Sequence, residues 1–114
     1  MKNKSTEIDE VRIPRNEVLL CGRVSSSAVV KELPSGDVVV EFRVVVDRLS
    51  SRGKKREVDS LDIAAWSASS RRSALSLKVD QWIEVTGSVR RRFWQAPSGL
   101  ASRWQVEAHR IRKS

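Results

Sequence analysis

The chain has 114 residues, of which 39% are hydrophobic and 32% are charged, the size and balance of one globular domain that buries its own core. No apolar run approaches the roughly 20 residues of a membrane-spanning helix, and the N-terminal residues lack the apolar segment of a secretory signal. The 22 Lys and Arg residues outnumber the 14 Asp and Glu residues, and the net charge of +8 favours a polyanionic partner such as a nucleic acid. The alternatives are an anionic membrane surface, for which no basic amphipathic helix is visible, and a basic protein without a polyanionic partner.

The cysteine content indicates a cytoplasmic protein. Cys21 is the single cysteine, so no intramolecular disulfide can form, whereas a secreted disulfide framework uses paired cysteines. Cys21 lies inside an apolar run, and we expect a small buried hydrophobic residue rather than a reactive thiol.

The N-terminal part predicts an arm followed by a strand. Residues 1–14 are polar and charged and predict a flexible arm. Val18–Val24 predicts the first strand, and Gly22 within it indicates the bulge or tight bend that a small barrel needs. We therefore expect one domain over residues 15–112, followed by a short basic end at residues 113–114.

The next segment predicts a second stretch of strand pairing, a turn and a long strand. Residues 29–33 are compatible with pairing in a sheet, and Pro, Ser, Gly and Asp at residues 34–37 predict a turn. Val38–Arg48 is rich in β-branched residues and predicts a long strand. Its alternation gives one face to the core, formed by Val38, Val40, Phe42, Val44 and Val46.

A basic loop and a short helix follow. Lys54, Lys55 and Arg56 end a polar loop that is either a solvated hairpin tip or a flexible phosphate-binding finger. Residues 57–66 predict the third strand, which ends at Trp66. Ser67 or Ser69 caps a short helix that reaches Leu77. We expect its inward side chains to be Ala68, Leu75 and Val79.

The most informative stretch is the fourth strand, residues 81–94. Alternation places Arg90, Arg92 and Trp94 on one face. The other face carries the apolar residues Ile83, Val85, Val89 and Phe93, which we assign to the core. Two cations and an indole in a row suit phosphates and unstacked bases. The alternative is a solvated edge strand with a tryptophan at its rim.

The element order predicts the fold class. Residues 96–99 form a hairpin turn, and residues 102–112 predict the last strand, so the order is β-β-β-α-β-β. This all-β layout with one short helix is that of the five-stranded, partly open OB-fold barrel. Such barrels bind oligonucleotides or oligosaccharides through one face and their hairpin loops, which here are Leu49–Arg56 and Gln95–Arg103.

The sequence offers no catalytic constellation. His109 is the only histidine and lies among arginines near the C-terminus. Asp59 and Asp62 are three residues apart, on opposite faces of a strand, which is poor geometry for a metal or an acid–base pair. No phosphate-binding loop and no Cys/His zinc spacing is present. We expect no enzyme activity, no metal and no cofactor. Trp82 is interpreted as a barrel-end or subunit-contact residue rather than a stacking platform.

Several segments together resemble the bacterial single-stranded DNA-binding protein family, most closely its short variants of actinobacterial type. The resemblance covers residues 16 to about 111, and its segments are Asn16–Val24, Leu33–Gly36, Phe42–Val44 and Ile83–Trp94. It implies an OB-fold, usually a homotetramer, that wraps single-stranded DNA without sequence preference in replication, recombination and repair. The implied location is the nucleoid in the cytoplasm.

The resemblance also implies roles for individual residues. Trp94 and Trp66 match base-stacking aromatic positions, and Trp104 matches a common tyrosine of the last strand. The matched basic positions are Arg23, Arg90 and Arg92. Together with the charge pattern, they complete the expected DNA-binding set: Arg23, Arg43, Lys54, Lys55, Arg56, Trp66, Arg90, Arg92, Trp94, Arg103 and Trp104.

The chain also departs from the family pattern. Leu49 and Ser50 stand where an aromatic is common, Ser60 where a tryptophan is common, and Asp62 where a basic residue is frequent. The acidic C-terminal tip by which longer members recruit partner enzymes is not expected here. Two other functions stay open from the residues: a single-stranded RNA binder, and an OB-fold subunit whose basic surface meets an acidic protein.

Overall fold

The computed structural model describes residues 11–49 and 57–114. Its elements in chain order are β1 (Val18–Val24), β2 (Val29–Glu32), β3 (Val38–Asp47), β4 (Val58–Ala65), α2 (Ala68–Leu75), β5 (Trp82–Ala96) and β6 (Gly99–Lys113). Over this part of the chain, no helix has the length and apolar character needed to cross a membrane.

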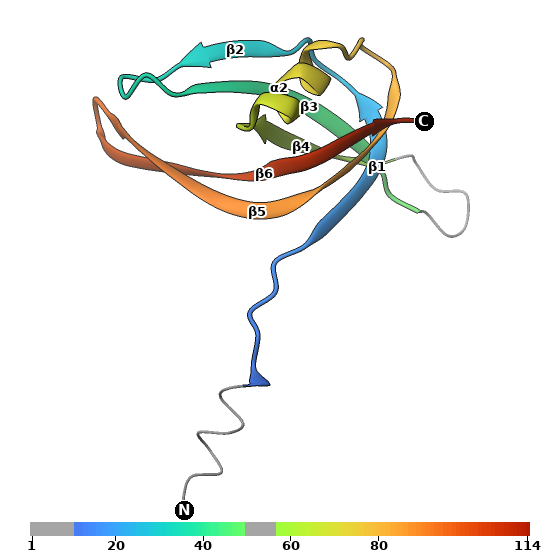
Figure 1. The fold of residues 1–114 in the computed structure, drawn as a ribbon, viewed down its shortest axis with the longest axis horizontal. Coiled ribbons are helices and arrows are strands. Elements are labelled where there is room, and N and C mark those ends of the chain that lie inside the picture. Colours follow the sequence, from blue (N-terminus) through green and yellow to red (C-terminus); the bar gives the residue numbers. More distant parts are fainter. Residues whose placement is uncertain (1–10, 50–56) are drawn as a thin grey trace, which may run out of the picture.

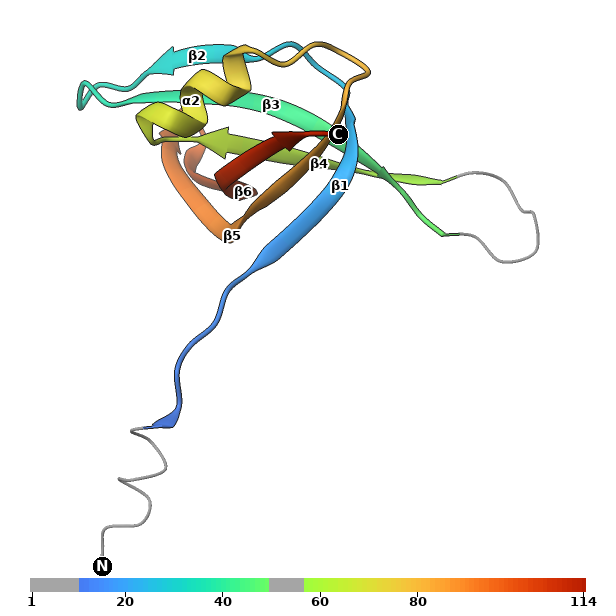
Figure 2. The ribbon, with the colours of Figure 1, turned by 45° about the vertical axis from the view of Figure 1, so that its right-hand side comes forward.

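Five of the strands close into a barrel. β1 pairs with β5 on one side and with β3 on the other, and the pairs β5–β6, β6–β4 and β4–β3 complete a ring of hydrogen-bonded strands (Figures 1 and 2). β4 and β6 run parallel, whereas the other neighbours run antiparallel. The predicted five-stranded barrel with one helix is therefore confirmed, and β2 is an additional short strand that joins the ring by pairing with β3.

Gly22 lies where β1 leaves β5 and reaches β3. A Cβ atom at this position would collide with the carbonyl oxygen of Val45 on β3, so only glycine lets the two backbones approach this closely. The ring closes next to it, through the pairs Arg23↔Val45 and Val24↔Val44. The expected bulge or tight bend at Gly22 is not observed, because β1 pairs with β5 without a shift in register through this residue, and the close approach of two backbones is what requires glycine.

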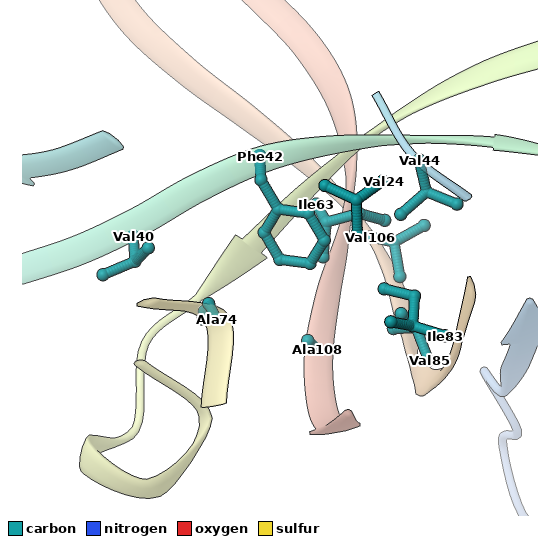
Figure 3. Packing of buried hydrophobic residues seen from close by; sticks show 11 residues of the cluster. Val24, Val40, Phe42, Val44, Ile63, Ala74, Ile83, Val85, Val106 and Ala108 are labelled. Atoms are coloured by element: carbon teal, nitrogen blue, oxygen red, sulfur yellow. The ribbon is translucent and has the colours of Figure 1, made fainter. Parts of the chain in front are cut away.

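The core fills the barrel with β-branched and small residues (Figure 3). Its buried members are Val24, Val40, Phe42, Val44, Ile63, Ala65, Ala74, Ile83, Val85, Val106 and Ala108. The expected core face of β3 is confirmed at Val40, Phe42 and Val44, and its two end residues are only partly buried.

Cys21 was expected in the core and is exposed instead. The even-numbered residues of β1 face the barrel interior, since Leu20 and Val24 pack there, so Cys21 points outward. Its Sγ atom lies 3.6 Å from a carboxylate oxygen of Glu84. Desolvation and this neighbouring carboxylate raise the pKa of the thiol.

The helix packs on the barrel with a different face from the expected one. Ser67 is the N-cap, and its hydroxyl accepts a hydrogen bond of 3.2 Å from the backbone N–H of Ser70. The buried side chains are Ser70 and Ala74, two small residues spaced by one turn that let α2 approach β3, β4 and β6. The assignment of Ala68, Leu75 and Val79 to the inward face is wrong, because all three are exposed.

β5 and β6 form a hairpin that extends well beyond the barrel (Figure 1). Each strand has 15 residues, and Val106 is the last core residue of β6 toward the hairpin tip. We call residues 90–105 the arm. The predicted alternation holds along β5, but the assignment of Val89 and Phe93 to the core is wrong, since 38% and 57% of their surfaces are exposed. Among the described residues, no element covers that face of the arm.

The N-terminal segment is tied to the hairpin just before the arm begins. The side-chain amide of Asn16 donates to the carbonyl oxygen of Val89 at 2.8 Å and accepts from its N–H at 2.9 Å. Through this pair of side-chain hydrogen bonds, the segment that precedes β1 is held against β5 two residues beyond the last backbone pair, Val18↔Gly87.

Candidate nucleic-acid interface

The outward faces of β2, β3, β4 and the arm meet along one groove. Its first hollow has a volume of about 330 Å³ and is lined by Lys31, Leu33, Glu41, Arg92, Trp94, Arg103 and Gln105. A second hollow of about 280 Å³ is lined by Ser26, Ser27, Val29, Lys31, Glu41, Phe42, Arg43, Asp62, Arg103 and Gln105. Because four residues line both hollows, they form one continuous path, which we call the groove.

Trp94 forms one wall of the groove. The guanidinium carbon of Arg103, its diagonal neighbour across the hairpin, lies 5.7 Å from the centroid of the Trp94 ring. The Trp94 side chain keeps 41% of its surface exposed. A flat aromatic ring flanked by a cation at the mouth of a groove can stack on an unpaired base while the cation contacts the adjoining phosphate.

A second aromatic, Trp66, lies beneath Arg92. The Arg92 guanidinium is 5.3 Å from the centroid of the Trp66 ring, and its NH1 atom is 3.0 Å from a carboxylate oxygen of Glu41. Trp66 follows the last residue of β4, and Arg71 of α2 donates a hydrogen bond to its backbone carbonyl. The helix therefore holds the backbone from which this indole projects.

Glu41 is the centre of the first hollow. Lys31 lies 3.0 Å from one of its carboxylate oxygens, while Arg92 at 3.0 Å and Gln105 at 2.9 Å donate to the other. Partial burial raises the pKa of the Glu41 carboxyl group, but the hydrogen bond from Gln105 and the two neighbouring cations outweigh it. The net pKa is lowered, so the carboxylate stays ionised at neutral pH.

In the second hollow, Asp62 likewise contacts two cations. The Nε atom of Arg43 lies 3.0 Å from one carboxylate oxygen, and an NH1 atom of Arg103 lies 3.7 Å from the other. Asp62 is thus shared between an arginine of β3 and an arginine of the arm. In the sequence, Asp62 is a poor catalytic candidate and a departure from the family pattern, and no role in the groove is predicted for it.

Of the predicted site residues, Arg43, Arg92, Trp94 and Arg103 meet in the groove, with Trp66 beside it. Two predicted arginines lie outside it. Arg23 is 3.9 Å from both Asp47 and Asp80, and Arg90 is 3.1 Å from Glu107. The remaining predicted cations, Lys54, Lys55 and Arg56, lie outside the described residues.

Trp104 lies on the opposite face of the arm from Trp94. It pairs with Arg91, whose guanidinium stands 5.2 Å from the Trp104 ring and 5.6 Å from the Phe93 ring. Arg91 also donates to the hydroxyl of Ser102 at 2.9 Å. The arm therefore presents an arginine with exposed aromatic rings on each of its two faces.

Sequence reasoning missed Lys31, Glu41, Gln105 and Arg91. Alternation along the arm gave the signal for Arg91, because it shares its face with Phe93. The other three gave no local signal, since they come together only through the barrel closure. Within residues 11–49 and 57–114, no group of three or more His, Cys, Asp or Glu side chains is arranged to hold a metal ion.

The fold and the groove define a class: a closed five-stranded barrel with a helix between β4 and β5 and an outward groove of cations and aromatics is a ligand-binding OB-fold. The model of the Single-strand binding protein family matches residues 15–113, and the chain belongs to this family. The family resemblance found in the sequence is confirmed, while the actinobacterial subtype stays a prediction.

Individual relatives agree with this assignment. The chain is 28% identical over 85 residues to the single-stranded DNA-binding protein of Clostridium tetani and 31% identical over 85 residues to that of Caldanaerobacter subterraneus. Each match covers 74% of this chain but 59% and 57% of the two relatives, so the chain spans less than two thirds of their length. A solved structure, the Plasmodium falciparum SSB complex with ssDNA, matches 90% of this chain and 97% of its own, with a TM-score of 0.73 and 20% identity, which shows the shared fold.

Proposed function

We propose that the chain binds single-stranded DNA without sequence preference and protects it during replication, recombination or repair, as a non-catalytic protein of the cytoplasmic nucleoid. The observation that carries the proposal is the groove, in which an exposed Trp94 ring lies beside Arg92 and Arg103. Family membership supports the same function.

The chemistry of the groove suits a flexible strand rather than a duplex. Arg92, Arg103 and Arg43 line the groove in this order and offer successive cations to a phosphate backbone. Trp94 and Trp66 offer ring faces, and stacking contributes roughly 1–3 kcal/mol per base without reading its edge. Only unpaired bases expose the ring faces that such stacking requires, so sequence tolerance and single-strand preference have one origin.

Other predicted contacts extend the path in this proposal. Arg23 on β1 and Arg90 on β5 add cations outside the groove, and residues 54–56 supply further cations. A strand that passes around the arm meets Trp104 together with Arg91 and Phe93 on its second face. The exposure of the Phe93 and Trp104 rings supports this second contact.

Salt dependence tests the electrostatic part of the mechanism. We expect the affinity for dT oligomers of graded length to fall steeply with salt, with a log–log slope of about −0.7 for each phosphate neutralised. The measurement is fluorescence anisotropy of labelled dT, with rU and duplex DNA of equal length as comparisons and with the oligomer checked for cleavage afterwards. An affinity that does not change with salt contradicts the mechanism, and preferential binding of rU or of an acidic protein identifies a different ligand.

We further propose that the protein assembles as a homotetramer through surface outside the groove. Trp82, with 48% of its surface exposed, and Leu19 share the outward face of β1 and β5. Burying these apolar side chains favours self-association. Sedimentation is expected to give about four times the chain mass of 12.9 kDa, and Trp82→Lys is expected to give smaller species. A wild-type monomer at tens of micromolar contradicts this proposal.

A further inference from the structure

We propose that Glu41 and Asp62 limit the affinity of the groove, because an incoming phosphate backbone must displace these carboxylates from the cations that would bind it. The two residues act as built-in competitors of the nucleic acid. This inference rests on the proposed single-stranded DNA binding and adds two affinity-setting residues to it.

Every cation that lines the groove forms an ion pair with a carboxylate that also lines it. Lys31 and Arg92 contact Glu41, while Arg43 and Arg103 contact Asp62. The four cations and two carboxylates give a local charge of +2, that is 4 − 2, half of what the cations alone would supply. The groove is therefore less electropositive than its arginine content suggests.

The carboxylates also lie in the path of the strand. Glu41 lines both hollows of the groove and Asp62 lines the second, so a strand that runs from Trp94 toward Arg43 passes over both. A phosphate near either carboxylate meets like-charge repulsion and binds an arginine only after replacing its present partner. Each carboxylate is paired with two cations, so releasing one of them frees two cations.

By contrast, Arg91 on the second face of the arm has no carboxylate partner among the described residues. Its contacts are the hydroxyl of Ser102 and the two aromatic rings. Carboxylate pairing is thus not a general requirement for an arginine of the arm to hold its position. The carboxylates in the groove compete with a phosphate for its cations, whereas no carboxylate contacts Arg91 in the part of the chain that the structure describes.

Asp62→Asn tests the proposal more sharply than Glu41→Gln does. It keeps the shape of the side chain, removes one negative charge, and releases Arg43 and Arg103 at once. We expect about three- to tenfold tighter binding of a dT oligomer at low salt. The salt slope should steepen by about 0.7 for each additional phosphate neutralised.

Glu17→Gln is the matched control. Glu17 is also ion-paired, with Arg15 at 3.9 Å, and does not line the groove, so the variant changes the net charge equally without freeing a groove cation. The experiment measures the anisotropy of labelled dT at low and moderate salt for the wild type, Asp62→Asn, Glu41→Gln and Glu17→Gln. Tightening confined to the two groove variants supports the proposal, whereas equal tightening in Glu17→Gln reduces it to a net-charge effect and overturns it.

The outcomes separate this inference from the proposed function. If the wild type binds dT and neither groove variant binds more tightly, the inference fails while the proposed function stands. If no protein in the set binds dT at low salt, both fail. Thermal melting accompanies each variant: loss of the fold in Asp62→Asn would make that carboxylate a structural residue and overturn its role as a competitor, and Glu41→Gln then tests the other carboxylate alone.

Discussion

Trp94→Ala is expected to weaken the binding of a dT oligomer by about ten- to a hundredfold, the loss of one stacked base per site. The ring lies on the outward face of the arm, against Arg103 and away from the barrel core. The thermal midpoint should therefore change little. Anisotropy titration and thermal melting of the same preparations measure the two effects separately.

Trp104→Ala is the matched comparison for this prediction. Trp104 lies on the same arm, with a similar cation–ring contact and 59% of its surface exposed, but on the face opposite the groove. We expect a smaller loss of affinity than for Trp94→Ala. An unchanged affinity in Trp94→Ala would remove the groove as the binding surface, and a larger loss in Trp104→Ala would move the main contact to the second face.

Phe42→Ala is expected to lower the free energy of unfolding by about 3–5 kcal/mol, because it leaves a cavity in the barrel. Phe42 is 3% exposed and packs among core residues of the barrel (Figure 3). The chain has only one other phenylalanine, Phe93 on the arm. Phe93→Ala should cost less than about 1 kcal/mol, as surface substitutions usually do.

Urea unfolding of both variants checks the difference. Similar losses for the two phenylalanines would mean that the apolar side of the arm is covered in solution, for example by a second copy of the chain. In that case the loss for Phe93→Ala should grow with protein concentration, because the covering contact forms between molecules.

Apart from the barrel, which followed from the order of the elements, the features that the sequence predicted correctly are local ones. The bounds of β1 were predicted as observed, and the core face of β3 followed from period-two alternation. The same alternation separated Trp94 from Phe93 on β5. Backbone geometry alone fixes which neighbours share a face, so these predictions need no knowledge of the tertiary structure.

The exposure of Phe93 and the missed carboxylates of the groove share a physical cause. Alternation assigned Phe93 to the correct face, but how far the hairpin extends past the barrel depends on the lengths of the other strands. The hydrogen bonds of Glu41 join it to Arg92 and Gln105, which are 51 and 64 positions away in the sequence. Such contacts are set by sheet register and ring closure, which no single segment encodes. The contacts of the groove carboxylates could therefore not be predicted from the sequence.

The pairing of β2 bears on how the protein avoids aggregation. β2 has four residues, all exposed, and pairs with β3, so its backbone offers a short free edge for another chain. Two valines, Val29 and Val30, make that edge apolar, but Lys31 follows them and is held across the strand by Glu41. A charged side chain fixed on a short edge discourages edge-to-edge stacking of barrels. The Lys31–Glu41 ion pair, which lowers the positive charge of the groove, thus also helps to keep neighbouring molecules from joining their sheets.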